Sequence, residues 1–205
     1  EKTQETIIQN LEFKASNAGK WLYADIEDTI EGLKNQIHQL LPSASIALVG
    51  EFARKMEIIS VAELLCAGEH LSAVKDHLST IENIEWDWKI SGPYTWRGKL
   101  LDQDLRVIFH FCSIEDFVSK KLSLTASTYH LISTTEDHES ISEKIQKKNY
   151  SSEEEFFSIN NLQFIPAEMR EGMGEVGLAA SNSIPVLLEE RDLKGILHNH
   201  STYSD

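Results

Sequence analysis

The stretch SIALVGEFARKMEIISVAELLCA, residues 45–67, decides the fold. Its two ends, SIALVG and VAELLCA, are short apolar runs that suit buried β-strands. The stretch therefore predicts two buried strands of a sheet.

Further strand and helix patterns follow this stretch, so we expect sheet from Ser45 to about Phe111. EHLSAVKDHLSTI, residues 69–81, has the spacing of one inserted helix, and LLDQDLRVIF, residues 100–109, is typical of another strand. In IEWDWKIS, residues 84–91, hydrophobic side chains alternate, which predicts a half-buried strand. These alternating residues share one face, which we interpret as a core face and not a base-stacking platform: Ile84, Trp86, Trp88 and Ile90.

Helical patterns flank the sheet on both sides. Before it, residues 1–41 are predicted to be helical, with Pro42 ending an apolar stripe formed by Ile26, Ile30, Leu33, Ile37 and Leu40. After it, SIEDFVSKKLSL (113–124) and SSEEEFFSI (151–159) predict helices, the second with a serine cap followed by glutamates. Residues 165–188 are rich in glycine and small residues and suggest a loop-rich linker. The expected class is α+β.

Composition sets limits on function. The chain has 205 residues, 41% of them hydrophobic and 25% charged, as in ordinary soluble domains. Two cysteines in apolar stretches and the lack of an apolar run of about 20 residues favour a cytoplasmic protein without a membrane span. The net charge of −14 disfavours tight binding to nucleic acid.

The end of the chain, ILHNHSTYSD, carries a candidate metal site. Alternate residues of a strand point the same way, so His198 and His200 can hold one metal ion together, with Asp205 as a third ligand. An exposed polar pair is the simpler alternative, because two histidines alone do not define a site. We expect no tightly bound metal within this chain, and an extended or disordered segment from about Ile184 onward.

Five segments, in this order, resemble a bacterial family X DNA polymerase: EIISVAELL, DQDLRV, LTASTYH, FIPAEMREGMGEVGLAA and IPVLLEERDLKGILHNHSTYSD. Such enzymes join a polymerase-beta-like core to a C-terminal polymerase-and-histidinol-phosphatase (PHP) domain. The resemblance implies a palm with a mixed sheet of about five strands and two helices on one face. It also implies four regions: a fingers-like segment (1–41), the palm (42–124), a thumb-like region (125–183), and a linker with the first strand of a truncated PHP domain (184–205).

In the palm, the resemblance places a triphosphate-binding turn, Gly-Ser-x-Arg-Arg, at residues 50–54. Gly50 and Arg54 are kept as nucleotide-binding candidates, but Glu51 replaces the serine and would repel phosphate. A salt bridge from Arg54 to Glu51 or Glu57 is the alternative to phosphate contact.

The family's Asp-x-Asp metal ligands correspond to Val61 and Glu63, and its third aspartate corresponds to Asp104. Glu63 and Asp104 are thus the catalytic candidates, expected close together on adjacent strands as a degenerate site for Mg²⁺ or Mn²⁺. Val61 cannot ligate metal, and it should share a face with Glu63. Solubility or a local hydrogen bond is the alternative role of both acids.

The thumb-like region departs from the family as well. Its Tyr-Phe-x-Gly-Ser segment, which packs on the incoming nucleotide, corresponds to SLTAS at residues 123–127. Three elements therefore differ from the family: the triphosphate-binding turn, the metal site and the segment that packs on the incoming nucleotide. These differences predict an inactive polymerase site.

Three functions stay open. The first is the core of a DNA-repair protein that binds or positions DNA weakly, beside a metal-dependent PHP phosphoesterase or nuclease with Zn²⁺ or Mn²⁺ bound at His198, His200 and Asp205. The second is an active DNA-directed polymerase that uses Glu63 and Asp104, with Asp102 as a further candidate. The third is a structural scaffold for the PHP domain, without nucleic acid.

Overall fold

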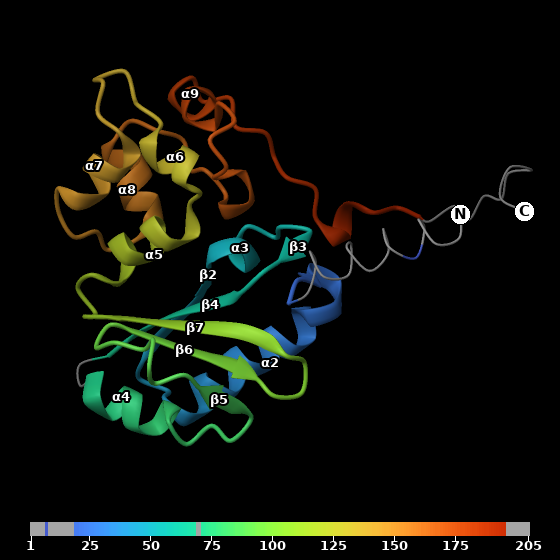
Figure 1. The fold of residues 1–205 in the computed structure, drawn as a ribbon. Coiled ribbons are helices and arrows are strands. Elements are labelled where there is room, and N and C mark those ends of the chain that lie inside the picture. The colour runs from blue at the N-terminus through green and yellow to red at the C-terminus, as the bar shows by residue number, and fades with distance from the viewer. Residues whose placement is uncertain (1–6, 8–18, 69–70, 196–205) are drawn as a thin grey trace, which may run out of the picture.

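The computed structural model describes residues 7, 19–68 and 71–195. These residues form a sheet body, residues 19–112, and a helical body, residues 113–184 (Figure 1). The sheet body contains a five-stranded mixed sheet with helices packed on it. This confirms the expected α+β class and is consistent with a polymerase-beta-like palm.

Only one pair of neighbours in the main sheet is parallel. The strands follow the order β2 (Ser45–Val49), β4 (Ala62–Ala67), β7 (Leu105–Cys112), β6 (Thr95–Leu100) and β5 (Ile84–Trp86). β4 and β7 are parallel, and the other neighbours are antiparallel. A second, two-stranded sheet pairs β1 (Trp21–Leu22) with β3 (Ile58–Ile59). The two apolar ends of the stretch 45–67 thus become the adjacent strands β2 and β4.

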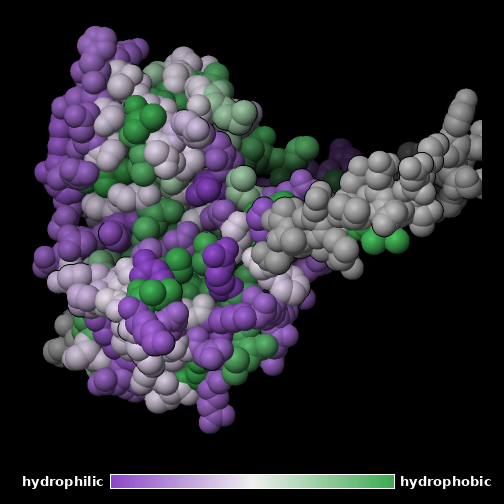
Figure 2. Space-filling view, in the orientation of Figure 1, coloured by the Kyte–Doolittle hydropathy of each residue, from purple (hydrophilic) through white to green (hydrophobic). Residues whose placement is uncertain are grey.

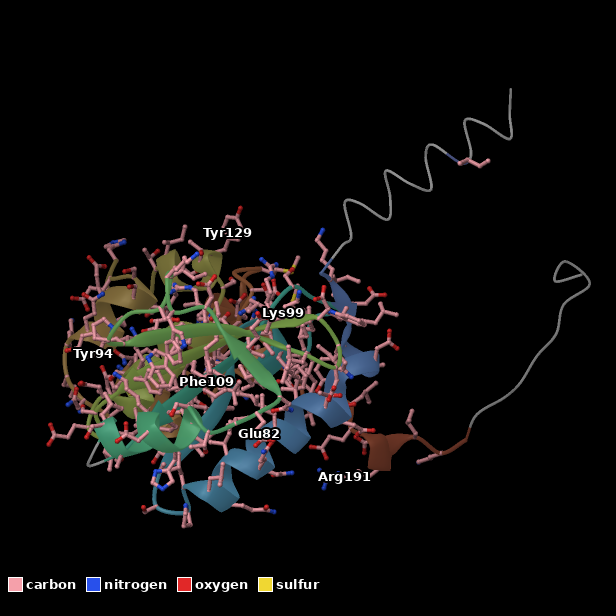
Figure 3. The ribbon with its side chains drawn as sticks, turned by 60° about the horizontal axis from the view of Figure 1, so that its bottom comes forward. Glu82, Tyr94, Lys99, Phe109, Tyr129 and Arg191 are labelled. Atoms are coloured by element: carbon pink, nitrogen blue, oxygen red, sulfur yellow. The ribbon has the colours of Figure 1, made fainter. Side chains whose placement is uncertain are left out.

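Two helices cover one face of the main sheet, α2 (Tyr23–Leu40) and α4 (Leu71–Leu78) (Figure 1). The predicted stripe of α2 is buried at four positions, Ile26, Ile30, Leu33 and Ile37, whereas Leu40 is 40% exposed. From the sheet, Leu64 of β4 and Phe109 of β7 join the same core, and Phe109 lies inside the sheet body in Figure 3.

The opposite face of the sheet is covered at its β2–β4 side. The short helix α3 (Gly50–Ala53) follows β2 directly, and α5 (Phe117–Thr125) packs on β2 and β4. Leu65 and Ala67 of β4 are buried there, with Phe117 and Leu124 packed against the cluster. This contact joins the helical body to the sheet body.

The helical body has its own core. It consists of α5, α6 (Thr128–Ile132), α7 (Ile141–Gln146), α8 (Glu153–Ile159), a 3₁₀ turn (Ala167–Met169) and α9 (Glu175–Ala180). Ser152 caps α8 as predicted, because its side chain accepts a hydrogen bond from the Glu155 amide. Ile165 and Ala179 are fully buried in this core. The segment 165–188 is loop-rich as predicted, but it is not a linker, because it packs into the core of this body.

Two strand predictions are corrected. LLDQDLRVIF is not one strand, because residues 101–104 form the turn between β6 and β7. IEWDWKIS forms a strand only over Ile84–Trp86, and the chain turns after it. Trp88 and Ile90 are therefore 55% and 58% exposed and are not core residues.

The surface is largely polar. Figure 2 shows hydrophilic residues over most of the visible face of both bodies, with hydrophobic residues in small groups. Among the described residues, no helix is both long enough and apolar enough to cross a membrane. A short 3₁₀ turn, Glu190–Asp192, lies near the end of the described part.

Candidate functional site

The centre of the candidate site is the junction of β2, α3 and β4. Gly50 opens α3 with φ of +67°, a left-handed conformation that favours glycine. A Cβ atom at this position would overlap Glu63 Oε1 and come within 2.9 Å of Glu63 Cδ. The glycine therefore lets the carboxylate of Glu63 lie against the backbone of the turn.

Glu51 is held by the backbone near β4. Its Oε2 accepts a hydrogen bond of 2.6 Å from the amide of Ser60. The carboxylate thus closes the loop between α3 and β4, at the position where the resemblance expects a serine. This contact gives Glu51 a structural role that needs no ligand.

Glu63 is engaged by a histidine of the neighbouring strand. Its Oε2 lies 2.7 Å from His110 Nε2, and the two side chains are only 20% and 14% exposed. The parallel register explains the contact. Leu65, which is two residues after Glu63 on β4 and on the same face, lies opposite His110. Val61 directly precedes β4 and offers no ligand atom beside this pair.

Asp104 is not brought to Glu63. It lies in the turn before β7, with φ of +58°, and its carboxylate pairs with Lys99 of β6 while remaining 71% exposed. Glu63 is opposite Ile108, four residues further along β7 than Asp104, so the two positions are about 13 Å apart along the strand direction. The elements are adjacent as expected, but the expectation that the two carboxylates lie close together is not met.

The donor set does not fit the two-metal centre that the resemblance implies. Glu63 is hydrogen-bonded to His110, Val61 has no donor atom, and Asp104 is paired with Lys99. Within residues 19–68 and 71–195, no group of three or more His, Cys, Asp or Glu side chains is placed to hold a metal ion. No reaction step through Mg²⁺ or Mn²⁺ can be derived from these residues.

Arg54 reaches across to the helical body. Its Nε donates to Glu171 Oε1 at 2.5 Å, and its second guanidinium nitrogen donates to the Thr125 carbonyl oxygen at 2.9 Å. A second ion pair, Lys55 to Glu168 at 3.2 Å, lies beside it. The expected partners Glu51 and Glu57 are thus wrong, because Glu171, which follows the 3₁₀ turn at 167–169, supplies the acid that pairs with Arg54.

The SLTAS segment has a structural role in the helical body. Thr125 is 1% exposed and ends α5, and Ala126 is 8% exposed. Ser127 caps α6, since its side chain accepts a hydrogen bond from the His130 amide. Residues 123–127 therefore contribute buried contacts and a helix cap, and they carry no aromatic ring that could pack on a nucleotide.

Sequence reasoning missed the partners His110 and Glu171, and it missed a buried pair in the helical body. His130 Nδ1 lies 2.5 Å from Glu175 Oε1, with both side chains at most 3% exposed. Burial lowers the pKa of His130 below its ordinary value, and the nearby charge of Arg170 adds to this. Burial alone would raise the pKa of Glu175, but hydrogen bonds from His130 and from backbone amides, including Gly172, lower it overall. The contact of His110 with Glu63 depends on the parallel register of β4 and β7, which the sequence does not mark, and nothing in the sequence marks Glu171.

The candidate metal ligands at the end of the chain, His198, His200 and Asp205, lie outside the described residues. The same is true of residues 1–6 and 8–18, which are 17 of the 41 residues predicted to be fingers-like.

Comparison with known proteins points to the same group of polymerases. No model of a protein family matches the chain. The chain is 25% identical, over 220 aligned residues, to the "DNA polymerase/3'-5' exonuclease PolX" of Bacillus subtilis (strain 168). The match covers 100% of this chain and 37% of that protein, so the chain spans little more than a third of its relative's length. This similarity supports a distant relationship to family X DNA polymerases.

Proposed function

We propose that this chain is the core of a family X polymerase-like DNA-repair protein that binds or positions DNA and no longer transfers nucleotides. The distant similarity to the Bacillus subtilis protein supports the class. The observation that carries the loss of polymerisation is the bond between Glu63 and His110, in a site where Val61 replaces a metal ligand and Asp104 pairs elsewhere.

The triphosphate turn supports the same proposal. Arg54, its remaining cation, already donates its guanidinium hydrogen bonds to Glu171 and to the Thr125 carbonyl. Glu51 adds a negative charge to the turn and is itself held by the Ser60 amide. An incoming triphosphate would have to displace Glu171 and approach Glu51, and like charges at contact distance repel strongly in a partly desolvated site. Both features oppose nucleotide binding.

In the longer parent that we propose, a PHP domain would perform metal-dependent phosphoester hydrolysis. His198, His200 and Asp205 would be ligands of Zn²⁺ or Mn²⁺ there, with further ligands from later strands. Metal analysis after dialysis tests this: the parent should retain metal, and the variants His198→Ala and His200→Ala should lose both metal and hydrolytic activity. Hydrolysis that survives both substitutions would exclude these residues as ligands.

Two assays test the proposal for this chain. With gapped DNA and all four nucleotides, we expect no primer extension in Mg²⁺ or Mn²⁺, while the Bacillus subtilis protein serves as the positive control. Fluorescence anisotropy with the same DNA should give a dissociation constant of about 10⁻⁶ M or weaker at physiological salt, with binding that falls steeply as salt rises. Extension that disappears in Asp104→Ala would instead establish an active polymerase.

A scaffold without nucleic acid is the second candidate, and the net charge of −14 favours it. The anisotropy titration separates the two candidates. If gapped DNA does not bind even at low salt, the scaffold is the better account.

A further inference from the structure

A cavity of about 580 Å³ lies at the end of the sheet where the parallel strands β4 and β7 finish. Its lining includes Gly68, which follows β4, and Cys112, the last residue of β7. Cys112 is four residues beyond the partner of Glu63 in the register, which is about 13 Å along the strand direction. The cavity is therefore separate from the candidate site around Glu63, and its volume is in the range of ligand sites.

The cavity exists because the chain leaves these two strands in opposite directions. After β4 it enters α4, which packs on one face of the main sheet, and after β7 it enters α5, which packs on the other face. Figure 1 shows α4 below the main sheet and α5 above it. When adjacent parallel strands connect to helices on opposite faces, a crevice opens outside their carboxyl ends, and ligands of open sheets bind in such crevices. The topology therefore marks this end of the sheet as a position for a ligand.

Part of the cavity lining is apolar and aromatic. Leu71 and Tyr94 belong to it, together with Phe111, which is buried. Tyr94 lies beside the end of β7, because its carbonyl oxygen accepts a hydrogen bond of 2.9 Å from the Phe111 amide. Its side chain is 68% exposed and lies near the edge of the molecule in Figure 3. This part of the lining suits a planar apolar group, since aromatic rings pack favourably on one another.

The rest of the lining is polar and contains one charge of each sign. Lys120 has no ion pair with another residue of the described part of the chain. Asp116 is already engaged, since its Oδ2 accepts a hydrogen bond of 2.8 Å from the Ser113 hydroxyl group. The ammonium group of Lys120 is thus available to one negative charge, whereas the carboxylate of Asp116 repels a second one. The lining therefore favours a monoanion.

The thiol of Cys112 lies close to these two charges. Burial raises the pKa of Cys112 to about 11, the charge of Asp116 adds to this rise, and the charge of Lys120 opposes it. Cys112 is 8% exposed, whereas the other cysteine of the chain, Cys66, is fully buried in the core under α2 and α4. A thiol reagent that enters the cavity can therefore reach Cys112 and not Cys66, so the modification of Cys112 reports whether the cavity is occupied.

We propose that this cavity binds a small planar aromatic carboxylate, with its ring against Leu71 and Tyr94 and its carboxylate on Lys120. The site is independent of the DNA-binding function proposed above. A dianion such as a phosphate monoester fits less well, because its second charge faces Asp116. Since only the folded chain has this cavity, binding should also raise the midpoint of thermal unfolding.

The rate at which N-ethylmaleimide modifies Cys112 tests the site, with naphthalene carboxylate as the probe and the neutral naphthalene carboxamide as its matched control. Both should slow the modification, and the carboxylate should do so with an apparent dissociation constant about fivefold lower, because only it pairs with an ammonium group. Lys120→Gln should abolish this difference. Lys89→Ala, which removes an exposed cation outside the cavity lining, should keep it. Tyr94→Ala should weaken the binding of both probes about fivefold, whereas Tyr94→Phe, which keeps the ring, should not.

Each outcome supports the site or overturns it. Protection of Cys112 that prefers the carboxylate and depends on Lys120 and on the ring of Tyr94 supports it. Equal protection by the carboxamide, or an unchanged preference in Lys120→Gln, overturns it, and so does a lack of protection at millimolar probe. Calorimetric titration of Cys112→Ser with both probes repeats the comparison without the thiol. Lys120 and Tyr94 are exposed, and thermal unfolding of each variant verifies that it is folded.

Discussion

A side chain at position 50 would be unfavourable for two reasons, the backbone conformation and the close approach of Glu63. Gly50 has φ of +67°, and a Cβ atom there would overlap the carboxylate of Glu63. Left-handed backbone costs a residue with a Cβ about 1–2 kcal/mol, and Glu63 would have to leave His110 as well. We therefore expect Gly50→Ala to lower the free energy of unfolding by about 2 kcal/mol, measured by urea denaturation.

The control for this substitution is Gly177→Ala. Gly177 lies within α9 and has no positive φ, and a Cβ atom added to it would meet no other atom within 4 Å. Alanine is a better helix former, so this variant should be neutral or more stable by about 0.5 kcal/mol. Equal effects of the two substitutions would contradict the close approach of Glu63 to the turn.

The buried pair His130–Glu175 predicts a loss of stability in acid. The pKa of His130 lies below its ordinary value of 6.5, so the folded protein takes up a proton less readily than the unfolded chain. The contribution of neutral His130 to the free energy of unfolding is therefore complete above pH 6.5 and is lost as the pH falls below it. The lowered pKa of Glu175 acts in the same direction below its ordinary value of 4.5.

A pH series of urea denaturations measures this effect. His130→Asn keeps a donor for Glu175 and removes the titrating group. Between about pH 7.5 and pH 5.5, the unmodified chain should lose stability relative to the variant. A relative gain on acidification would mean that Glu175 stabilises the charged imidazolium more than burial destabilises it.

Among the elements, the hairpin β6–β7 differs most from the sequence prediction. Asp104 has a left-handed backbone in its turn and an exposed carboxylate, so we interpret it as a turn residue. Asn also adopts this conformation readily, whereas a β-branched residue does not. Asp104→Asn should change the free energy of unfolding by less than about 0.5 kcal/mol, and Asp104→Val should lower it by about 1–2 kcal/mol. Chemical denaturation checks both, and a large loss in Asp104→Asn would show that the carboxylate itself matters.

At the scale of the whole molecule, the sequence predicted those parts that depend on local pattern. The stripe of α2, the serine cap of α8 and the strand β4 follow from residues a few positions apart. Trp88 kept the alternation of a strand although the chain had already turned, because periodicity does not mark where a strand ends. The segment 165–188 was predicted to be a linker because it is rich in glycine and small residues, whereas its packing depends on a few widely spaced buried residues.

The candidate site was harder to predict because its contacts join distant parts of the chain. Glu63 and Val61 were identified through the resemblance, but the partner His110 depends on the parallel register of β4 and β7. Asp104 lies in the predicted neighbouring element, yet the turn directs it to Lys99. Arg54 and Glu171 are 117 residues apart, and only the packing of the two bodies brings them together.

That packing yields a prediction for the molecule as a whole: the Arg54–Glu171 pair fixes the helical body on the sheet body. The side chains are 11% and 26% exposed, and Arg54 also binds the Thr125 carbonyl, so solvent screens this pair less than a surface pair. A double-mutant cycle with Arg54→Ala and Glu171→Ala should give a coupling energy of about 1–2 kcal/mol by urea denaturation. The control cycle at Glu31 and Lys34, a pair within α2 that is 43% and 36% exposed, should give at most about 0.5 kcal/mol. If both cycles give the same small coupling energy, apolar contacts of α5 with β2 and β4 hold the two bodies together. Arg54 would then be available to bind an anion.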